Sequence, residues 1–413
     1  MVLLIKNIRQ LIQILEPEIQ WVAGNNMSHL NLIENAWLSI RDGLIDDFGR
    51  MDSGIPDAEE LIDASGKIVM PAFCDSHTHL VYAGSREQEF VDRIQGLSYE
   101  QIARRGGGIN NSAKRLRVTS EDELFEEAMN RIHEIISQGT GAVEIKSGYG
   151  LDTESELKML RVIRRLKENT PLTVRSTFLG AHAVPAEFSG NQEGYVDMLI
   201  SDMLPKVVAE GLADFIDVFC DEGFFTVENT ARILEAGALS GLRPKIHANE
   251  MANSGGIQTG IKFNAISVDH LEFTGKDEID ALLGSSTMPT LLPGAALFLG
   301  LNQPPAREMI SAGLPIALAS DFNPGSSPSG NMMLMMALGC ISLKMLPEEV
   351  IHAATINSAF AMGIEKEAGS ITKGKKANLI ITKKVPGYTF LPYAYGSNLI
   401  DTMILNGCII ENK

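Results

Sequence analysis

Histidine is scarce in this chain, and two of its histidines lie almost side by side. The sequence has 413 residues and 8 histidines, and His77 and His79 occur in "FCDSHTHL", directly after the apolar residues Ile68 to Ala72. Residues i and i+2 of a strand point to the same side, so both imidazoles can face one ion. Neutral imidazole suits zinc or iron(II). The spacing favours a metal site, although one packed and one exposed histidine would also explain it.

Three further residues with metal-binding side chains follow later apolar runs. His247 comes after Pro244–Ile246, His270 after Ala265–Val268, and Asp321 after Pro315–Ala319. His247 and Asp321 would complete a set of four ligands with the first two histidines and leave a position open for water. One such ion would lower the pKa of a bound water toward 7.

The elements that must position these residues alternate between apolar strands and amphipathic helices. Two of the helical stretches open with a capping box, Ser120 with Glu123 and Thr153 with Glu156. Eight strand–helix units predict a TIM barrel, with a doubly wound sheet as the alternative, and a barrel places its chemistry past the carboxyl ends of its strands. Five of the 8 histidines lie at such ends. The predicted strands are Ile68–Phe73, Ala142–Ile145, Leu172–Phe178, Phe215–Phe219, Pro244–Ile246, Ala265–Val268, Thr287–Leu292 and Pro315–Ala319.

The two ends of the chain are typical of β-hairpins. Asp42-Gly43 and Asn406-Gly407 each separate two short alternating runs. Because a lone hairpin is barely stable, both ends are predicted to pack together as one small β-domain. The predicted division is residues 1–66 with 369–413 for this domain and 67–368 for the barrel.

Composition narrows the possible partners. The formal net charge of -17 argues against nucleic acid and anionic membranes. The 4 cysteines are scattered, and no run approaches the roughly 18 apolar residues of a membrane span, so a reducing cytoplasm is expected. The glycine-rich stretch "RRGGGI" at residues 104–109 lacks the Lys-Ser/Thr pair of a phosphate loop; an ordinary turn is expected there, with a mobile flap over the site as the alternative.

Six motifs in this order resemble the amidohydrolase superfamily: "FCDSHTHL", "KSGYGL", "GAHAVP", "IHANE", "VDHLE" and "SDFNPGSSP". The resemblance covers essentially the whole chain and implies a TIM barrel with a composite β-sandwich. It implies one zinc or iron ion on His77, His79, His247 and Asp321. The fourth strand ends in "FCDEGF", without the lysine that bridges two metals in other branches, and Cys220 and Asp221 are more simply explained as a core residue and a local hydrogen-bonding group.

Within that superfamily the motifs are most similar to enzymes that open the cyclic amide of 4-imidazolone-5-propanoate to N-formimidoyl-L-glutamate in histidine catabolism. The resemblance implies catalytic roles for Glu250, His270 and Asp321, and the choice of general base among the three stays open. A homodimer is the family expectation. The residues implied in binding this anionic small molecule are Arg86, Tyr149, His182, Glu250, Asn323, Gly325 and Ser326.

Plainer structural roles compete with several of these assignments. A loop arginine such as Arg86 is more often a surface charge, Glu250 could be a helix cap, and turn chemistry alone explains "DFNPGSS". Two rival functions also remain. A mononuclear deaminase of a purine, pyrimidine or related amine would use the same metal ligands but would not need an anion pocket. A non-catalytic scaffold would typically lack the ligands.

Overall fold

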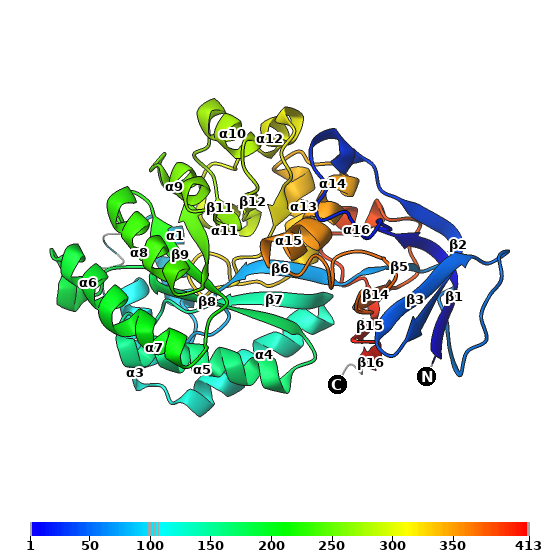
Figure 1. Cartoon of the computed structure of the whole chain (residues 1–413), viewed down its shortest axis with the longest axis horizontal. Coiled ribbons are helices and arrows are strands. Elements are labelled where there is room, and N and C mark those ends of the chain that lie inside the picture. The colour runs from blue at the N-terminus through cyan, green and yellow to red at the C-terminus, as the bar shows by residue number, and fades with distance from the viewer. Residues whose placement is uncertain (1, 98–100, 102–104, 106, 411–413) are drawn as a thin grey trace.

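The computed structural model describes residues 2–97, 101, 105 and 107–410. Arg104 and Gly106 of the predicted glycine-rich loop lie outside the described residues. A large body of strands and helices lies beside a smaller β region, and both ends of the chain belong to the smaller one (Figure 1). Within the described part of the chain, no helix is both long and apolar enough to cross a membrane.

The large body is a parallel eight-stranded barrel, as predicted. Each strand pairs with the next along the chain, and the backbone closes the ring: the N–H of Asp321 donates to the carbonyl of His77 at 2.9 Å, and the N–H of His79 donates to the carbonyl of Phe322 at 3.0 Å. The strands are β6 (Phe73–Thr78), β7 (Thr140–Lys146), β8 (Thr173–Ala181), β9 (Phe215–Cys220), β10 (Arg243–Ala248), β11 (Ser267–His270), β12 (Met288–Leu291) and β13 (Ala317–Leu318).

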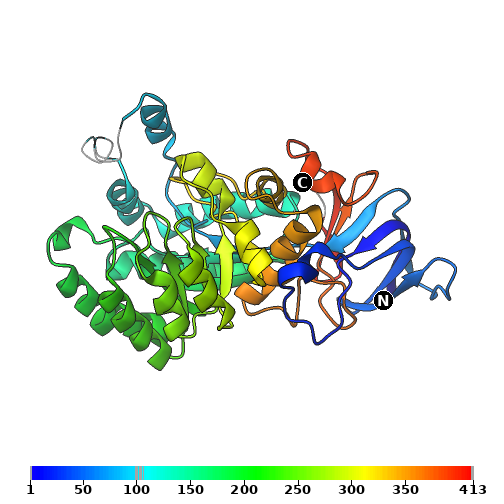
Figure 2. The same ribbon diagram turned by 90° about the horizontal axis from the view of Figure 1, so that it is seen from above.

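Helices cover the outside of the barrel (Figure 2). Ser120 and Glu123 form the predicted capping box of α4. The predicted box at Thr153 is wrong, because Asp152 caps α5 by accepting from the N–H of Ser155 at 2.8 Å, and Glu156 turns inward instead. The helices are α1 (Glu87–Ile94), α3 (Ile109–Val118), α4 (Glu121–Ser137), α5 (Thr153–Asn169), α6 (Gln192–Met198), α7 (Leu204–Ala209), α8 (Val227–Leu239), α9 (Gly256–Lys262), α10 (Lys276–Leu283), α11 (Pro293–Leu299), α12 (Ala306–Ala312), α13 (Met332–Ile341), α14 (Pro347–His352), α15 (Ser358–Ala361) and α16 (Phe390–Tyr393).

The small region is a mixed sheet built from both ends of the chain. Its hairpins turn at Asp42-Gly43 and Asn406-Gly407, as predicted, with all four residues at positive φ. The sheet bends over a core of its own, and the N–H of Ile45 reaches the carbonyl of Lys375 at 2.9 Å. Its strands are β1 (Val2–Ile12), β2 (Leu32–Arg41), β3 (Leu44–Arg50), β4 (Glu60–Asp63), β5 (Ile68–Pro71), β14 (Leu379–Thr382), β15 (Ile400–Leu405) and β16 (Cys408–Ile410).

One predicted strand is assigned to the wrong sheet. The run Ile68–Phe73 is not the first barrel strand: Ile68–Pro71 is β5, which pairs with β1 and β14 in the small sheet, and the barrel begins at β6. An apolar run buried on both faces has the same pattern in either sheet, so composition alone does not separate them. The boundary between the small β-domain and the barrel, predicted at residue 66, stays a prediction.

Candidate metal centre and active site

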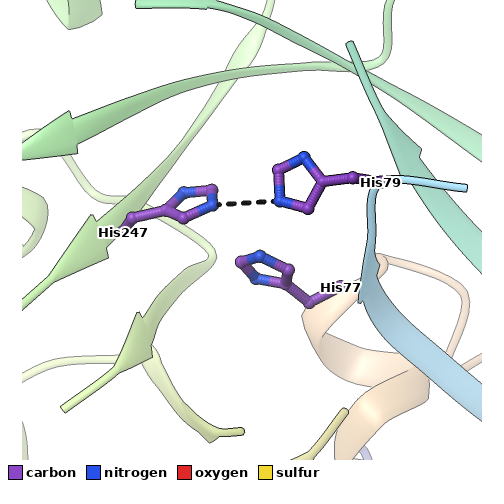
Figure 3. A group of neighbouring side chains, drawn as sticks. All are labelled: His77, His79 and His247. Atoms are coloured by element: carbon purple, nitrogen blue, oxygen red, sulfur yellow. Dashed lines mark hydrogen bonds between the residues drawn. The ribbon is translucent and has the colours of Figure 1, made fainter. Parts of the chain in front are cut away.

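The four predicted metal ligands meet at the carboxyl end of the barrel. His77 lies in β6, His79 directly follows it, His247 lies in β10, and Asp321 follows β13. Figure 3 shows the three imidazoles turned toward one another from two strands. Nε2 of His79 is 3.4 Å from Nε2 of His247, and Oδ1 of Asp321 is 3.5 Å from Nε2 of His77 and 3.6 Å from Nε2 of His79.

These separations fit a bound ion better than they fit hydrogen bonds. Two ligand atoms at about 2.05 Å from a tetrahedral ion lie roughly 3.3–3.4 Å apart. Nε2 of His77 is buried and has no hydrogen-bond partner among the described residues. His77 also groups closely with His270 and Asp321, which makes His270 an immediate neighbour of the centre. The cluster can hold a metal ion.

Two buried carboxylates stand behind the ligands and determine which ring nitrogen faces the ion. Nδ1 of His77 donates to Asp269 at 2.7 Å, and Nδ1 of His247 donates to Asp217 at 3.1 Å. With the hydrogen on Nδ1, the lone pair of each ring lies on Nε2, where a metal needs it. Sequence reasoning missed both carboxylates, although a charged residue inside an apolar strand was an available signal.

A buried lysine forms ion pairs with these carboxylates. Nζ of Lys146 lies 2.7 Å from Glu144, 2.8 Å from Asp217 and 3.7 Å from Asp269, and all four side chains are fully buried. Lys245 pairs with Glu144 in the same layer. Burial alone would raise the pKa of Asp217, but His247 and Lys146 hold it well below its usual range. The barrel interior below the metal site therefore contains a charged layer, in which the positive charges of the two lysines offset the negative charges of the carboxylates.

His270 lies beside the metal site among three carboxylates, those of Asp321, Glu250 and Glu272. Its Nε2 is 3.6 Å from Glu250 and its Nδ1 is 3.8 Å from Glu272. Burial alone would lower the pKa of His270, but Glu250 and Glu272 raise it to about 10. A divalent cation held beside it would oppose that rise. Sequence reasoning also missed Glu272, a buried side chain whose two oxygens have no hydrogen-bond partner in the described part of the chain.

Glu250 is held over the site by the turn that follows β10. Asp221 accepts from the backbone N–H groups of Glu250, Met251 and Ala252 at 2.7, 2.9 and 3.1 Å. Cys220 is a buried core residue, as predicted, whereas Asp221, among the described residues, bonds locally only to the N–H of Glu222, at 2.7 Å, and otherwise to this distant turn. Burial raises the pKa of Glu250 to about 7, close to the working range of a proton shuttle.

The turn after Asp321 is organised by one amide side chain. Oδ1 of Asn323 accepts from the N–H groups of Gly325 and Ser326 at 2.7 and 2.8 Å, and its Nδ2 donates to the carbonyl of Asp321 at 2.7 Å. The hydroxyl of Ser326 donates to Oδ2 of Asp321 at 3.1 Å. The Asn323 amide is thus engaged within the turn, and its predicted contact with product stays a prediction.

The predicted anion-binding arginine reaches the same turn. A Cβ added to Gly325 would lie 2.3 Å from a guanidinium nitrogen of Arg86, so glycine leaves the room that this side chain occupies. Arg86 is largely buried and donates to Glu89 at 2.5 Å. The structure therefore brings together Arg86 and Gly325, which are far apart in the sequence.

Tyr149 and His182 lie on another side of the site, next to His79. The ring of His182 stacks on His79 with centroids 5.0 Å apart, and Tyr149 lies 5.5 Å from His182. Burial lowers the pKa of His182 to about 3, so the ring is neutral. All the sequence-predicted site residues therefore lie on the loops and strand ends around one centre.

Comparison with known proteins agrees with this fold. Solved structures share the whole architecture at low sequence identity, which shows the fold alone. E. coli guanine deaminase superposes with a TM-score of 0.74 at 14% identity, covering 100% of this chain and 99% of that one. An adenosine deaminase from Xanthomonas campestris with bound zinc gives 0.69 at 15% identity, covering 98% and 92%.

The amidohydrolase family model matches residues 68–410, and the chain belongs to this family. Curated relatives named imidazolonepropionase are similar over nearly the full length. The protein of Flavobacterium johnsoniae is 57% identical, with 99% of this chain and 100% of that one covered. The protein of Geobacillus kaustophilus is 42% identical, with 99% and 98% covered.

Proposed function

We propose that this protein has imidazolonepropionase activity, opening the cyclic amide of 4-imidazolone-5-propanoate with water to give N-formimidoyl-L-glutamate in histidine degradation. The observation that carries the proposal is the 57% identity, over 99% of the chain, to a relative of that name. The convergence of His77, His79, His247 and Asp321 supports it, because this reaction needs an activated water.

The metal is proposed to be one zinc or iron ion per chain, held by His77, His79, His247 and Asp321. When bound, it would supply Lewis acidity to water and to the substrate carbonyl. Elemental analysis of the purified protein is expected to give about one ion per chain. Two ions, or none after growth in metal-supplemented medium, would contradict this proposal.

The remaining groups bind substrate and move protons. Arg86 would hold the propanoate carboxylate, since a guanidinium can bind a carboxylate through two hydrogen bonds. The attacking oxygen forms a bond to the ring carbonyl carbon, the carbon–nitrogen bond of the cyclic amide breaks, and a proton of the water passes to the departing nitrogen. His270, Asp321 and Glu250 are the proposed candidates for that transfer, since they lie among or beside the predicted metal ligands. Glu250 is the proposed carrier, because its pKa is about 7.

Loss of the imidazolone ultraviolet absorbance on addition of enzyme tests the activity. Formation of N-formimidoyl-L-glutamate in equal amount is the expected result. Release of ammonia from nucleobases, with the imidazolone left intact, would instead identify a deaminase. Location in the cytoplasm stays a prediction from the composition, and assembly as a homodimer stays a prediction from the family resemblance.

A further inference from the structure

A buried carboxylate lies behind the turn that carries Tyr149. Glu156, in the first turns of α5, is fully buried and accepts from the backbone N–H groups of Gly148, Gly150 and Leu151 at 3.0, 2.7 and 2.9 Å. Asp152 already caps the helix, so this carboxylate is not needed for that purpose. Its three bonds all go to the turn.

The turn has little stability of its own. Gly148 lies at φ +110° and Leu151 at φ +57°, a conformation that is unfavourable for leucine. A Cβ on Gly150 would lie 2.5 Å from the backbone nitrogen of Glu156, so the turn packs directly on the start of α5. Three N–H groups converging on one carboxylate compensate for this conformation.

The same turn contacts His182, one of the residues predicted to bind substrate. The carbonyl oxygen of Gly148 lies 3.0 Å from Nδ1 of His182. A carbonyl can only accept, so the hydrogen of the neutral ring is on Nδ1. Nε2 of His182 is then a bare acceptor, on a ring that stacks against His79.

We propose that Glu156 is a positioning residue that holds the Gly148 carbonyl against His182, so that the bare Nε2 of His182 accepts a hydrogen bond from a ring N–H of the substrate. The identity of that substrate rests on the proposed function, whereas the tautomer of His182 does not. An imidazolone ring has the N–H donor that this acceptor requires. A ligand that offers only an acceptor at this point would be disfavoured, because two lone pairs would then face each other.

The tautomer is measured first, on the wild-type protein loaded with its metal and without substrate. Long-range ¹H–¹⁵N correlation spectra, with His182 assigned by the signal missing in His182→Asn, should show the hydrogen on Nδ1 alone. A hydrogen on Nε2, or on both nitrogens, would overturn the proposal. This result does not depend on which substrate the enzyme takes.

Glu156→Gln then tests the positioning role. Glutamine keeps the size but replaces one acceptor oxygen with an NH₂ group, which leaves part of the turn unbonded. The variant should show a mixture of His182 tautomers and a KM raised roughly 5- to 20-fold, with kcat changed less than KM and metal content unchanged. Glu154→Gln, on the exposed face of the same helix, is the matched control and should behave as wild type.

The outcomes separate the two proposals. An unshifted tautomer and an unchanged KM in folded Glu156→Gln would show that Glu156 is merely structural. If wild type has the hydrogen on Nδ1 but does not open the imidazolone ring, the proposed function fails while the positioning role stands for another ring that bears an N–H. If Glu156→Gln does not fold, the wild-type spectrum alone decides whether His182 is fixed as an acceptor.

Discussion

The two halves of the active site are built in different ways. The metal half lies on strands β6 and β10 and the segment that closes the barrel, and two of its histidines, His77 and His247, are backed by Asp269 and Asp217. The substrate half lies on turns, and each turn is held by one polar side chain that binds backbone N–H groups: Glu156, Asp221 and Asn323. Strands fix the ligands, and single side chains fix the turns.

This difference indicates that the turns, and not the metal half, determine which substrate the protein takes. Proteins that share only 14–15% identity keep the same barrel, including deaminases of guanine and adenosine. An activated water can attack many different carbon–nitrogen substrates, so a metal site cannot by itself choose one of them. The choice must come from the turns. Disrupting the metal half should therefore abolish activity, whereas disrupting a turn should change KM or the pH profile.

The largest effect is expected for His247→Ala. Removing one imidazole leaves the centre with three ligands, and loss of the ion removes several kcal/mol of transition-state stabilisation, a fall in kcat/KM of at least about 10³-fold. Metal content measured with activity checks this expectation. His133→Ala, on the exposed side of α4, is the control. A His247→Ala protein with a full complement of metal would contradict the assignment.

Lys146→Met should be the most destabilising change in the charged layer. It leaves Glu144, Asp217 and Asp269 buried with too little positive charge, which costs roughly 3–5 kcal/mol of the free energy of unfolding. Urea unfolding measures this loss. Lys276→Met, whose side chain is 83% exposed, should change stability little. Equal stability of the two variants would mean that the layer is not a compensated network.

The sequence predicts the ligands of the metal half better than it predicts the buried side chains that hold the site in place. A two-residue histidine spacing and eight apolar runs suffice to predict a barrel and the place where His77, His79, His247 and Asp321 meet. Asp269 and His77 are 192 residues apart, and their contact depends on the register of two strands, which local patterns do not contain. For the same reason the sequence pattern predicts a capping box at Glu156, whose side chain turns inward, and predicts Ile68–Pro71 as a barrel strand, although it belongs to the small sheet.

Arg86→Ala tests the anion pocket of the substrate half. If the guanidinium binds the propanoate tail, the variant should lose roughly 2–4 kcal/mol in kcat/KM, mostly through a higher KM. An imidazolone without the propanoate group is the matched comparison, because both proteins should turn it over equally poorly. An unchanged kcat/KM for the full substrate would exclude Arg86 from tail binding.

The smallest expected effect is the pH dependence set by Glu250. Its pKa is raised from 4.5 to about 7, so the carboxyl is neutral below that pH and ionised above it. If the carboxylate accepts the proton of water, kcat/KM should fall about tenfold per unit as pH drops below 7, and Glu250→Gln should lack this limb. A limb on the alkaline side would make Glu250 a proton donor instead.

Stability gives an independent measure of the same group. Because the folded-state pKa is above the unfolded value, the buried carboxyl favours the folded state most below pH 4.5, and that contribution is lost as pH rises to about 7. The free energy of unfolding of the wild type should therefore fall relative to that of Glu250→Gln as the pH rises from 4.5 to 7. A constant difference between the two proteins would show that Glu250 titrates normally and that its turn does not tune it for proton transfer.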